Sequence, residues 1–328
     1  MAFIGIDLGT TNSLACVYQK GEMILIPNQL GKYQTPSVVS YTENGLVVGE
    51  AAKSNLILSP DQTAASFKTF MGTNKIYNLG GETYLPEELS ALVIKQIVAD
   101  AETFLQEPVT EAIISIPAYF NDAQRCATKL ATQLAGVHVE RLINEPSAAA
   151  LYYQMTYGKK DGCIMVIDFG GGTLDVSIVE CFENIIEIIG IAGDNHLGGN
   201  DVDHEIAKFF CRQNGISLEN LNNEERAILY KQAEKAKIML SANEIATMVL
   251  VAQNKEYRLI LTNKLMTETC NDLFQRIKKI INQAVKNCSR RPAIDNVVLV
   301  GGSGKLTALQ KYLSDLFGRQ VYAAPEPE

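Results

Sequence analysis

One short motif occurs twice, half a chain apart, and it limits the possible folds more than any other feature. The chain opens with an apolar run that leads into Asp7-Leu8-Gly9-Thr10-Thr11, and a second apolar run leads into Asp168-Phe169-Gly170-Gly171-Gly172-Thr173. Each copy predicts a buried strand, a tight polar turn and a return strand. One copy alone is typical of an ordinary hairpin. Two copies without a low-complexity linker predict two similar lobes that meet at a hinge.

Both turns carry groups that suit phosphate. Glycines let backbone N–H groups approach a phosphate closely, and threonine hydroxyls add further donors. Asp7 and Asp168 stand beside these donors, and a carboxylate next to a polyphosphate needs a cation between them. Mg²⁺ fits because it prefers oxygen ligands and keeps several waters. The sequence contains neither a P-loop nor a Rossmann fingerprint, so the phosphate site would be built from the two turns.

The rest of the chain alternates strand-like and helix-like segments, which predicts an α/β fold with mixed sheets. The expected strands cover residues 3–6, 14–18, 22–26, 112–116, 163–168, 175–181, 185–191 and 296–300. One helix should start at Asn121 or Asp122 and stop at Gly136, with an apolar face of Ala127, Leu130, Ala131 and Leu134. Two more should cover 222 to about 241 and 303–317.

Composition excludes several classes of protein. The 328 residues suggest about two domains, and 29 basic against 37 acidic residues give a net charge of −8. Such a chain has no general attraction for nucleic acid or anionic membranes. It shows no signal peptide and no apolar run long enough for a transmembrane helix. Seven scattered cysteines and three histidines form no zinc-type spacing, which favours a reducing compartment and no His or Cys metal site.

Two weaker patterns remain ambiguous on spacing alone. Gly301-Gly302-Ser303-Gly304-Lys305 follows an expected strand and opens an expected helix, where a nucleotide could approach or where glycine could serve packing only. Glu234, Lys237 and Ser241 share one helix face, a pattern that more often marks a solvated stripe.

Longer strings connect these segments to a known family. They are Gly5-Ile6-Asp7-Leu8-Gly9-Thr10-Thr11-Asn12-Ser13, Ile116-Pro117-Ala118-Tyr119-Phe120-Asn121-Asp122-Ala123-Gln124-Arg125, Leu142-Ile143-Asn144-Glu145-Pro146-Ser147, Asp168-Phe169-Gly170-Gly171-Gly172-Thr173-Leu174-Asp175, Gly193-Asp194-Asn195-His196-Leu197-Gly198-Gly199 and Val300-Gly301-Gly302-Ser303. In these strings the chain resembles, from end to end, the nucleotide-binding domain of DnaK-type chaperones of the 70-kDa heat-shock protein family. It is most similar to the compact HscC-type branch, because it is short between Phe70 and Leu89 and again around residues 249–261.

The resemblance implies an actin-like two-lobed ATPase fold, in which duplicated ribonuclease-H-like mixed sheets carry flanking helices and smaller outer subdomains. Lobe I would cover 1–178, with an inner subdomain of 1–36 and 106–178 and an outer subdomain of 37–105. Lobe II would cover 179–328, with an inner subdomain of 179–215 and 290–328 and an outer subdomain of 216–289. The family continues with a closing helix, a linker and a peptide-binding domain, so we expect this chain to belong to a longer protein.

The resemblance also implies roles for individual residues. Catalysis would involve Lys68, Glu145, Asp168 and Asp175, and Asp7 and Asp168 would place Mg²⁺ through its waters. The nucleotide would be bound by Gly9, Thr10, Thr11, Asn12, Gly170, Gly171, Gly172, Thr173, Gly198, Gly199, Glu234, Lys237, Ile238, Ser241, Gly301, Gly302, Ser303 and Lys305. Pro117 and Arg125 would relay the nucleotide state to other domains. Lys305 and Ile238 stand where relatives carry arginine, which would weaken adenine stacking.

The function implied is an ATP-hydrolysing motor domain of a cytoplasmic, monomeric chaperone, with ATP or ADP, Mg²⁺ and K⁺ as cofactors. Its expected partners are a J-domain co-chaperone, a nucleotide exchange factor and, through the peptide-binding domain, unfolded peptides. Two alternatives share the fold class: a phosphotransferase of the sugar-kinase type and a nucleotide-controlled filament protein. Neither explains the strings around Asn121 and Glu145.

Overall fold

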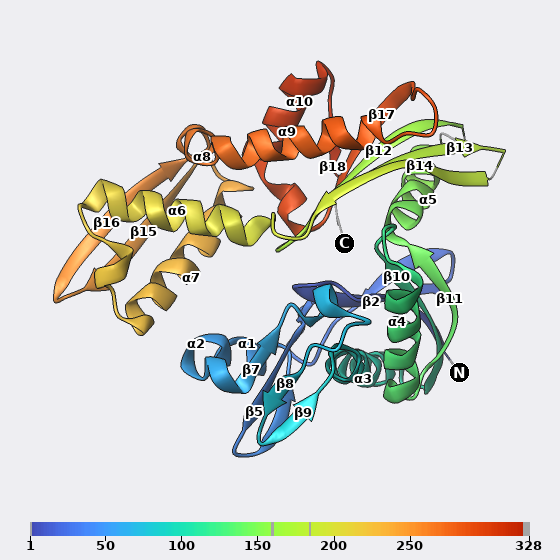
Figure 1. Ribbon diagram of the computed structural model, residues 1–328, viewed down its shortest axis with the longest axis horizontal. Coiled ribbons are helices and arrows are strands. Elements are labelled where there is room, and N and C mark those ends of the chain that lie inside the picture. Colours follow the sequence, from blue (N-terminus) through green and yellow to red (C-terminus); the bar gives the residue numbers. More distant parts are fainter. Residues whose placement is uncertain (1, 159–160, 184, 324–328) are drawn as a thin grey trace. The chain divides into compact units, whose positions relative to one another are not determined.

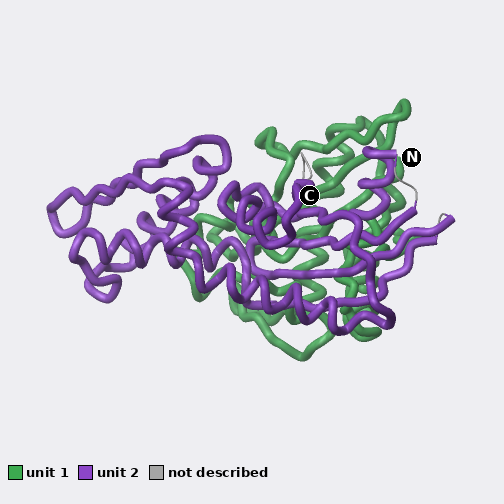
Figure 2. The backbone as a smooth tube through the Cα atoms, turned by 90° about the horizontal axis from the view of Figure 1, so that it is seen from above, with its two compact units in different colours: residues 1–148 green, residues 149–328 purple. Residues whose placement is uncertain are grey.

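The computed structural model describes residues 2–158, 161–183 and 185–323, and it divides into two compact units. The first unit is residues 1–148 and the second is residues 149–328 (Figure 2). Each unit has its own mixed sheet and its own hydrophobic core.

The sheet of the first unit follows the order β11-β10-β1-β2-β3, and β4 pairs with β2. Figure 1 labels β2, β10 and β11 of this sheet. The strands are β1 (Ala2–Asp7), β2 (Asn12–Gln19), β3 (Glu22–Ile26), β4 (Thr35–Pro36), β10 (Val109–Ile116) and β11 (His138–Asn144). The three strands β1, β10 and β11 run parallel, whereas β2 and β3 are antiparallel neighbours. The carboxyl ends of the parallel strands therefore meet at one edge, which is where side chains that follow such strands can gather.

Helices and smaller sheets complete the first unit. The helices α3 (Pro86–Leu105) and α4 (Asp122–Ala135) pack against each other, and apolar residues of α3 belong to the same core as β1 and β10. The outer part holds α1 (Glu50–Lys53), α2 (Asn55–Leu58), a sheet of β6 (Gly45–Val48), β5 (Val38–Thr42) and β7 (Thr63–Ala65), and the hairpin of β8 (Tyr77–Leu79) and β9 (Glu82–Tyr84). Two 3₁₀ turns, Pro60–Gln62 and Phe67–Phe70, lie between these elements.

The second unit repeats the strand order of the first. Its sheet runs β14-β13-β12-β17-β18, with β12 (Gly162–Phe169), β13 (Leu174–Phe182), β14 (Ile185–Asp194), β17 (Ile294–Val300) and β18 (Tyr322–Ala323). As in the first unit, the strand that ends in Asp-x-Gly has an antiparallel neighbour on one side and a parallel neighbour on the other. The predicted duplication is therefore present in the topology (Figure 1).

Helices cover both faces of the second sheet, which explains why β12 is an almost uninterrupted apolar run. On one face α5 (Glu145–Tyr157) packs through Ala150 and Tyr153, and the other face joins a large core. The remaining elements are α6 (Gly199–Asn214), α7 (Asn223–Leu240), α8 (Asn263–Thr269), α9 (Asn271–Lys286), α10 (Thr307–Phe317), the hairpin of β15 (Ile245–Ala252) and β16 (Lys255–Thr262), and 3₁₀ turns at Leu218–Asn220 and Gly302–Lys305.

The strongest local signals predicted helix ends correctly. Asn121 caps α4 by accepting from the amide of Gln124, and Gly136 ends it at a φ of 82°. Asn222 caps α7 in the same way through Glu225, and Ser241 ends that helix. The expected strands are also confirmed, each within a few residues of its observed bounds.

Two expectations about helices were wrong. The segment 303–317 is a 3₁₀ turn followed by α10, because Leu306 takes an extended conformation between them (φ −63°, ψ 110°) and buries its side chain. On α4, Leu130 and Leu134 are 43% and 52% exposed. The face that packs consists instead of small residues, namely Ala127, Thr128, Ala131 and Thr132.

The compact units divide after residue 148, and this division keeps β12, β13, β14 and β17 in one sheet of the second unit. The predicted lobes, 1–178 and 179–328, and their inner and outer subdomain limits stay predictions.

The buried Asp100 allows the pH dependence of stability in the core of the first unit to be tested. This aspartate of α3 is 6% exposed, and Gln96 donates to it at 3.0 Å. Burial raises the pKa of Asp100, which hydrogen bonds from Gln96 and Gln29 only partly oppose. Since the folded state then holds the proton more tightly than the unfolded chain, stability falls as pH rises from about 3.9 through the raised pKa. We expect Asp100→Asn to remove this loss.

The measurement is the free energy of unfolding in urea, at about pH 4 and about pH 7. Relative to the parent protein, Asp100→Asn should gain stability as pH rises, and the exposed Glu111→Gln is the control. If the difference in the free energy of unfolding between Asp100→Asn and the parent protein stays constant with pH, burial does not raise the pKa of Asp100.

Candidate functional site

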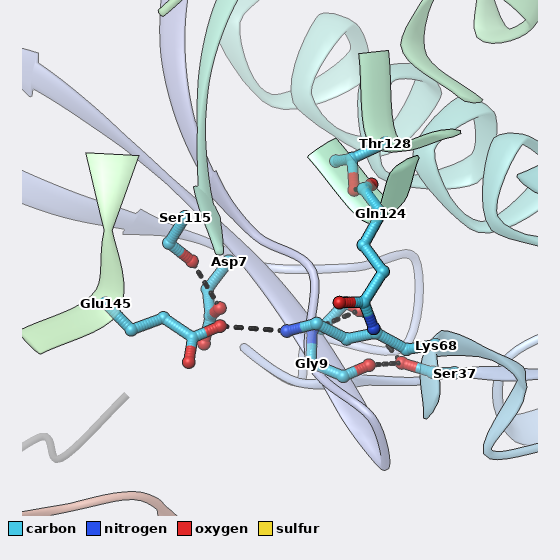
Figure 3. Close-up of polar contacts among 9 residues, drawn as sticks. Asp7, Gly9, Ser37, Lys68, Ser115, Gln124, Thr128 and Glu145 are labelled. Carbon is cyan, nitrogen blue, oxygen red and sulfur yellow. Dashed lines mark hydrogen bonds and ion pairs between the residues drawn. The ribbon is translucent and has the colours of Figure 1, made fainter. Parts of the chain in front are cut away.

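The parallel strands of the first unit bring Asp7 and Glu145 to one edge of the sheet. Asp7 ends β1 opposite Ser115 of β10, and Asn144 ends β11 opposite Ile116, so Glu145 comes next at the same edge. The hydroxyl of Ser115 donates to Asp7 Oδ1 at 2.6 Å (Figure 3). This bond holds the carboxylate of Asp7 in one orientation.

Lys68 reaches the same edge from the 3₁₀ turn Phe67–Phe70. Its Nζ lies 2.8 Å from Glu145 Oε1, and the side chains are only 7% and 17% exposed (Figure 3). Burial raises the pKa of Glu145 and the negative charge of Asp7 raises it further, whereas the ammonium of Lys68 opposes both. A buried cation beside two carboxylates suits a reaction in which negative charge on oxygen must be stabilised.

The first of the two predicted phosphate turns, residues 9–12, needs its glycine. A Cβ at Gly9 would run into the backbone carbonyl of Asn12, so no other residue fits this turn without moving its backbone. Thr10, Thr11 and Asn12 follow Gly9 and are all half-buried. The four predicted residues therefore form one compact segment that leads from β1 into β2.

The second phosphate turn is fastened to the start of α6. Gly170 N donates to Thr173 O at 3.0 Å, which closes the turn itself. Gly199 N and Asn200 N then donate to the carbonyls of Gly170 and Gly171 at 2.9 and 2.7 Å. A Cβ at Gly198 would lie 2.5 Å from the backbone of Gly171, so glycine is required where the two backbones meet.

Asp168 and Asp175 face each other across β12 and β13, and glycines flank both carboxylates. A Cβ at Gly193 would lie 2.6 Å from Asp175 Oδ1, and one at Gly301 would lie 2.5 Å from Asp168 Oδ1. Gly301 also has a φ of 81°, which other residues rarely adopt. The two glycines therefore let the backbone approach both carboxylates closely, and carboxylate oxygens are the kind of ligand that Mg²⁺ prefers.

Three of the other predicted nucleotide residues, one each from α6, α7 and the turn Gly302–Lys305, lie together. A Cβ at Gly199 would collide with Ser303 Oγ and lie 3.2 Å from Lys237 Nζ, so these three residues are neighbours. Glu234 and Ser241 are half-buried on α7, while Ile238 is 61% exposed and Lys305 is exposed. The face of Glu234, Lys237 and Ser241 is thus not the solvated stripe that its spacing favoured.

Lys237 is engaged by the protein itself. Its Nζ lies 2.7 Å from Asp203 Oδ2 and donates to the carbonyl of Gly199 at 2.9 Å, and both side chains of the ion pair are 11% exposed. This ammonium ties α7 to the first turn of α6, so the beginning of α6 is held from two sides.

Comparison with protein families decides between the alternatives. The family model described as Hsp70 protein matches residues 3–327. The chain belongs to the Hsp70 family. Hsp70 proteins are ATP-binding chaperones and ATPases with the actin-like fold, and the duplicated sheets described above agree with that fold. Family members bind ATP or ADP, with Mg²⁺ generally associated, and generally work with J-domain co-chaperones and nucleotide exchange factors.

In this Hsp70 domain the two predicted relay residues, Pro117 and Arg125, lie directly after β10 and on α4. Arg125 Nη2 donates to Asn144 Oδ1 at 3.0 Å, and Arg125 Nε donates to the carbonyl of Phe120, also at 3.0 Å. Pro117 follows β10 directly, and its carbonyl accepts from Phe120 N at 3.2 Å. Arg125 therefore links α4 to Asn144, the residue that precedes Glu145.

The sequence reasoning missed several residues of this Hsp70 site. Asp203 lies one helical turn after Gly199, so the sequence places it near that glycine, but its pairing with Lys237 follows only from the fold. Ser115 gave no local signal, because its role arises only from strand register. Gly193 belongs to one of the family strings, but its contact with Asp175 also depends on register. Within the described residues no cluster of three or more His, Cys, Asp or Glu could hold a metal, and no helix is long and apolar enough to cross a membrane.

Proposed function

We propose that both phosphate turns serve one Mg·ATP and that water is the acceptor of its γ-phosphoryl group. The observation that carries the proposal is the buried Lys68–Glu145 pair beside Asp7. Magnesium, held through its waters by Asp7 and Asp168, would supply positive charge to the phosphate oxygens. Phosphoryl transfer needs positioning and charge neutralisation more than covalent help, so the proposal requires no covalent intermediate with the protein.

The chain's own residues have distinct roles in this proposal. Lys68 stabilises the negative charge on the transferred group, and Glu145 and Asp175 orient the attacking water. The turns bind the phosphates through Gly9, Thr10, Thr11, Asn12, Gly170, Gly171, Gly172 and Thr173, with Gly198 and Gly199 behind the second turn. The adenosine lies on Glu234, Lys237, Ile238, Ser241, Gly301, Gly302, Ser303 and Lys305. Because Lys237 is bound to Asp203, its part in this set is to fix α6 and α7.

The experiment must separate hydrolysis from transfer to another acceptor. We would incubate the protein with Mg·ATP in potassium buffer, with and without a mixture of sugars, and measure ADP and free phosphate in the same sample. Equal amounts of ADP and phosphate, unchanged by sugar, are expected of a water-directed ATPase. ADP that exceeds free phosphate when sugar is present would overturn the proposal in favour of a phosphotransferase.

The remaining expectations are proposals that rest on the family. We propose a cytoplasmic, monomeric motor that is stimulated by a J-domain protein, exchanges nucleotide with the help of an exchange factor, uses K⁺ and acts on unfolded peptides through a further domain. Pro117 and Arg125 would transmit its nucleotide state. We also propose membership of the compact HscC-type branch, supported by the small β8–β9 and β15–β16 hairpins in the regions where the sequence is short.

A further inference from the structure

Two fully buried serines lie directly behind the first phosphate turn. Ser13 of β2 is 0% exposed, and Ser37, between β4 and β5, is 1% exposed. A buried hydroxyl is costly unless it is hydrogen-bonded, and these two are bonded to each other at 2.9 Å. They also bond both backbone groups of Gly9. Gly9 N donates to Ser13 Oγ at 3.1 Å. Ser37 Oγ donates to Gly9 O at 2.7 Å, as Figure 3 shows.

The number of protons fixes the direction of every bond in this group. Each serine hydroxyl has one proton to donate. Ser37 gives its proton to the carbonyl of Gly9, because a carbonyl can only accept. Ser37 must therefore accept from Ser13, and Ser13 in turn accepts from the amide of Gly9. The result is a closed ring in which all donors point the same way, and such bonds polarise and strengthen one another.

The same segment holds the turn at a second place. Ser37 N donates to Thr11 O at 2.8 Å, and β4 pairs with the start of β2, where Asn12 lies opposite Pro36 and Ser13 opposite Thr35. The turn is thus held by its own strand and by a segment more than twenty residues further along the chain. Ser37 also precedes β5, so the turn is linked to the outer sheet of the first unit.

We propose that Ser13 and Ser37 are positioning residues for phosphate binding: their hydroxyl ring holds Gly9 so that Thr10 and Thr11 present their donors to the phosphates of the nucleotide. The inference rests on the proposed function, because it assumes that this turn binds phosphate. It assigns the serines no contact with the nucleotide. Their effect must therefore be confined to the phosphates and must not extend to the adenosine.

The test compares ligands with and without phosphate. We would measure by calorimetry the dissociation constants of Mg·ADP and of adenosine for the parent protein, Ser13→Ala, Ser37→Ala and the double variant. Ser13→Ala removes the acceptor of the Gly9 amide, and Ser37→Ala removes the donor to the Gly9 carbonyl. Each change opens the ring, so Mg·ADP should bind about ten-fold more weakly. Adenosine binding should stay within about two-fold. The double variant should resemble the single variants, because either change alone breaks the ring.

Ser40→Ala is the matched control. Ser40 of β5 is also 0% exposed and hydrogen-bonded, but to Gln62 O and Thr63 Oγ1 and not to the turn. It should lose stability without a change in the preference for ADP over adenosine. If the alanine variants do not fold, Ser13→Cys and Ser37→Cys, which keep the size and a weak donor, should show the same selective loss in smaller measure.

The outcomes separate the two proposals. A parent protein that binds Mg·ADP no more tightly than adenosine would refute the proposed function. If the parent protein prefers Mg·ADP but the serine variants keep that whole preference, or bind adenosine and Mg·ADP equally more weakly, the positioning role is refuted. The proposed function would then still stand.

Discussion

Lys68→Ala should slow the release of phosphate from Mg·ATP by about a hundred- to a thousand-fold while Mg·ADP binding changes only a few-fold. Lys68 is a buried cation at the carboxyl ends of the parallel strands of the first unit, and the side chain of its partner Glu145 is mostly buried. A group that acts on charge formed during the reaction lowers turnover more than ground-state binding. The measurement is single-turnover phosphate release, together with the dissociation constant of Mg·ADP.

Lys75→Ala is the matched control for this change. Lys75 lies seven residues away, is exposed, and contacts only the rings of Phe70 and Tyr77 among the described interactions of its side chain. It removes the same charge and should leave phosphate release within about two-fold. Equal losses of binding and turnover in Lys68→Ala would make Lys68 a ground-state contact and refute its catalytic role.

Lys68→Ala could also act indirectly, and the pH dependence distinguishes the two routes. Without the ammonium, burial and Asp7 would raise the pKa of Glu145 still further, because Lys68 no longer opposes them. If protonation of Glu145 caused the loss, phosphate release by the variant would recover as pH rises from about 7 to about 9. We expect the loss to persist over this range, because the missing charge is that of Lys68 itself.

Asp203→Asn should lower the free energy of unfolding by about 3 kcal/mol, measured in urea. The ion pair of Asp203 and Lys237 is buried on both sides, and removing one partner leaves the other charge without compensation in the core. The variant should also bind nucleotide more weakly, because Lys237 holds the carbonyl of Gly199 at the start of α6.

The same helix offers a control for that prediction. Glu205 of α6 pairs with Lys208 at 2.8 Å, with side chains 30% and 45% exposed. Glu205→Gln removes the same kind of charge from an exposed pair and should cost about 0.5 kcal/mol or less. The double variant Asp203→Asn, Lys237→Met should recover part of the stability, because neither partner of this buried pair then carries a charge. Similar costs for Asp203→Asn and Glu205→Gln would show that burial of the pair is not decisive.

Sequence reasoning succeeded where the signal is local. The caps at Asn121 and Asn222 and the glycine turns depend on residues a few positions apart, so the sequence alone defined them. It failed where register or packing decides. Leu130 and Leu134 are exposed because small residues form the packed face of α4, and Asp203 and Ser115 acquire partners only through the fold. The resemblance assigned catalytic roles to both Lys68 and Glu145, which are 77 residues apart in the sequence, and their ion pair follows only from the fold.

The shared strand order also explains why the outer parts of such a chain can differ in size. The strands β3 and β14 lie at the edges of their sheets, whereas β10 lies beside β1 and β17 lies beside β12. The chain must therefore cross the sheet between β3 and β10, and again between β14 and β17. All of the small outer sheets are inserted in these two crossings. Residues can therefore be gained or lost there over evolution without shifting Asp7 or Asp168, whose positions are fixed by the central strands. The duplicated sheets form a constant frame, and the crossings are where relatives of different lengths can diverge.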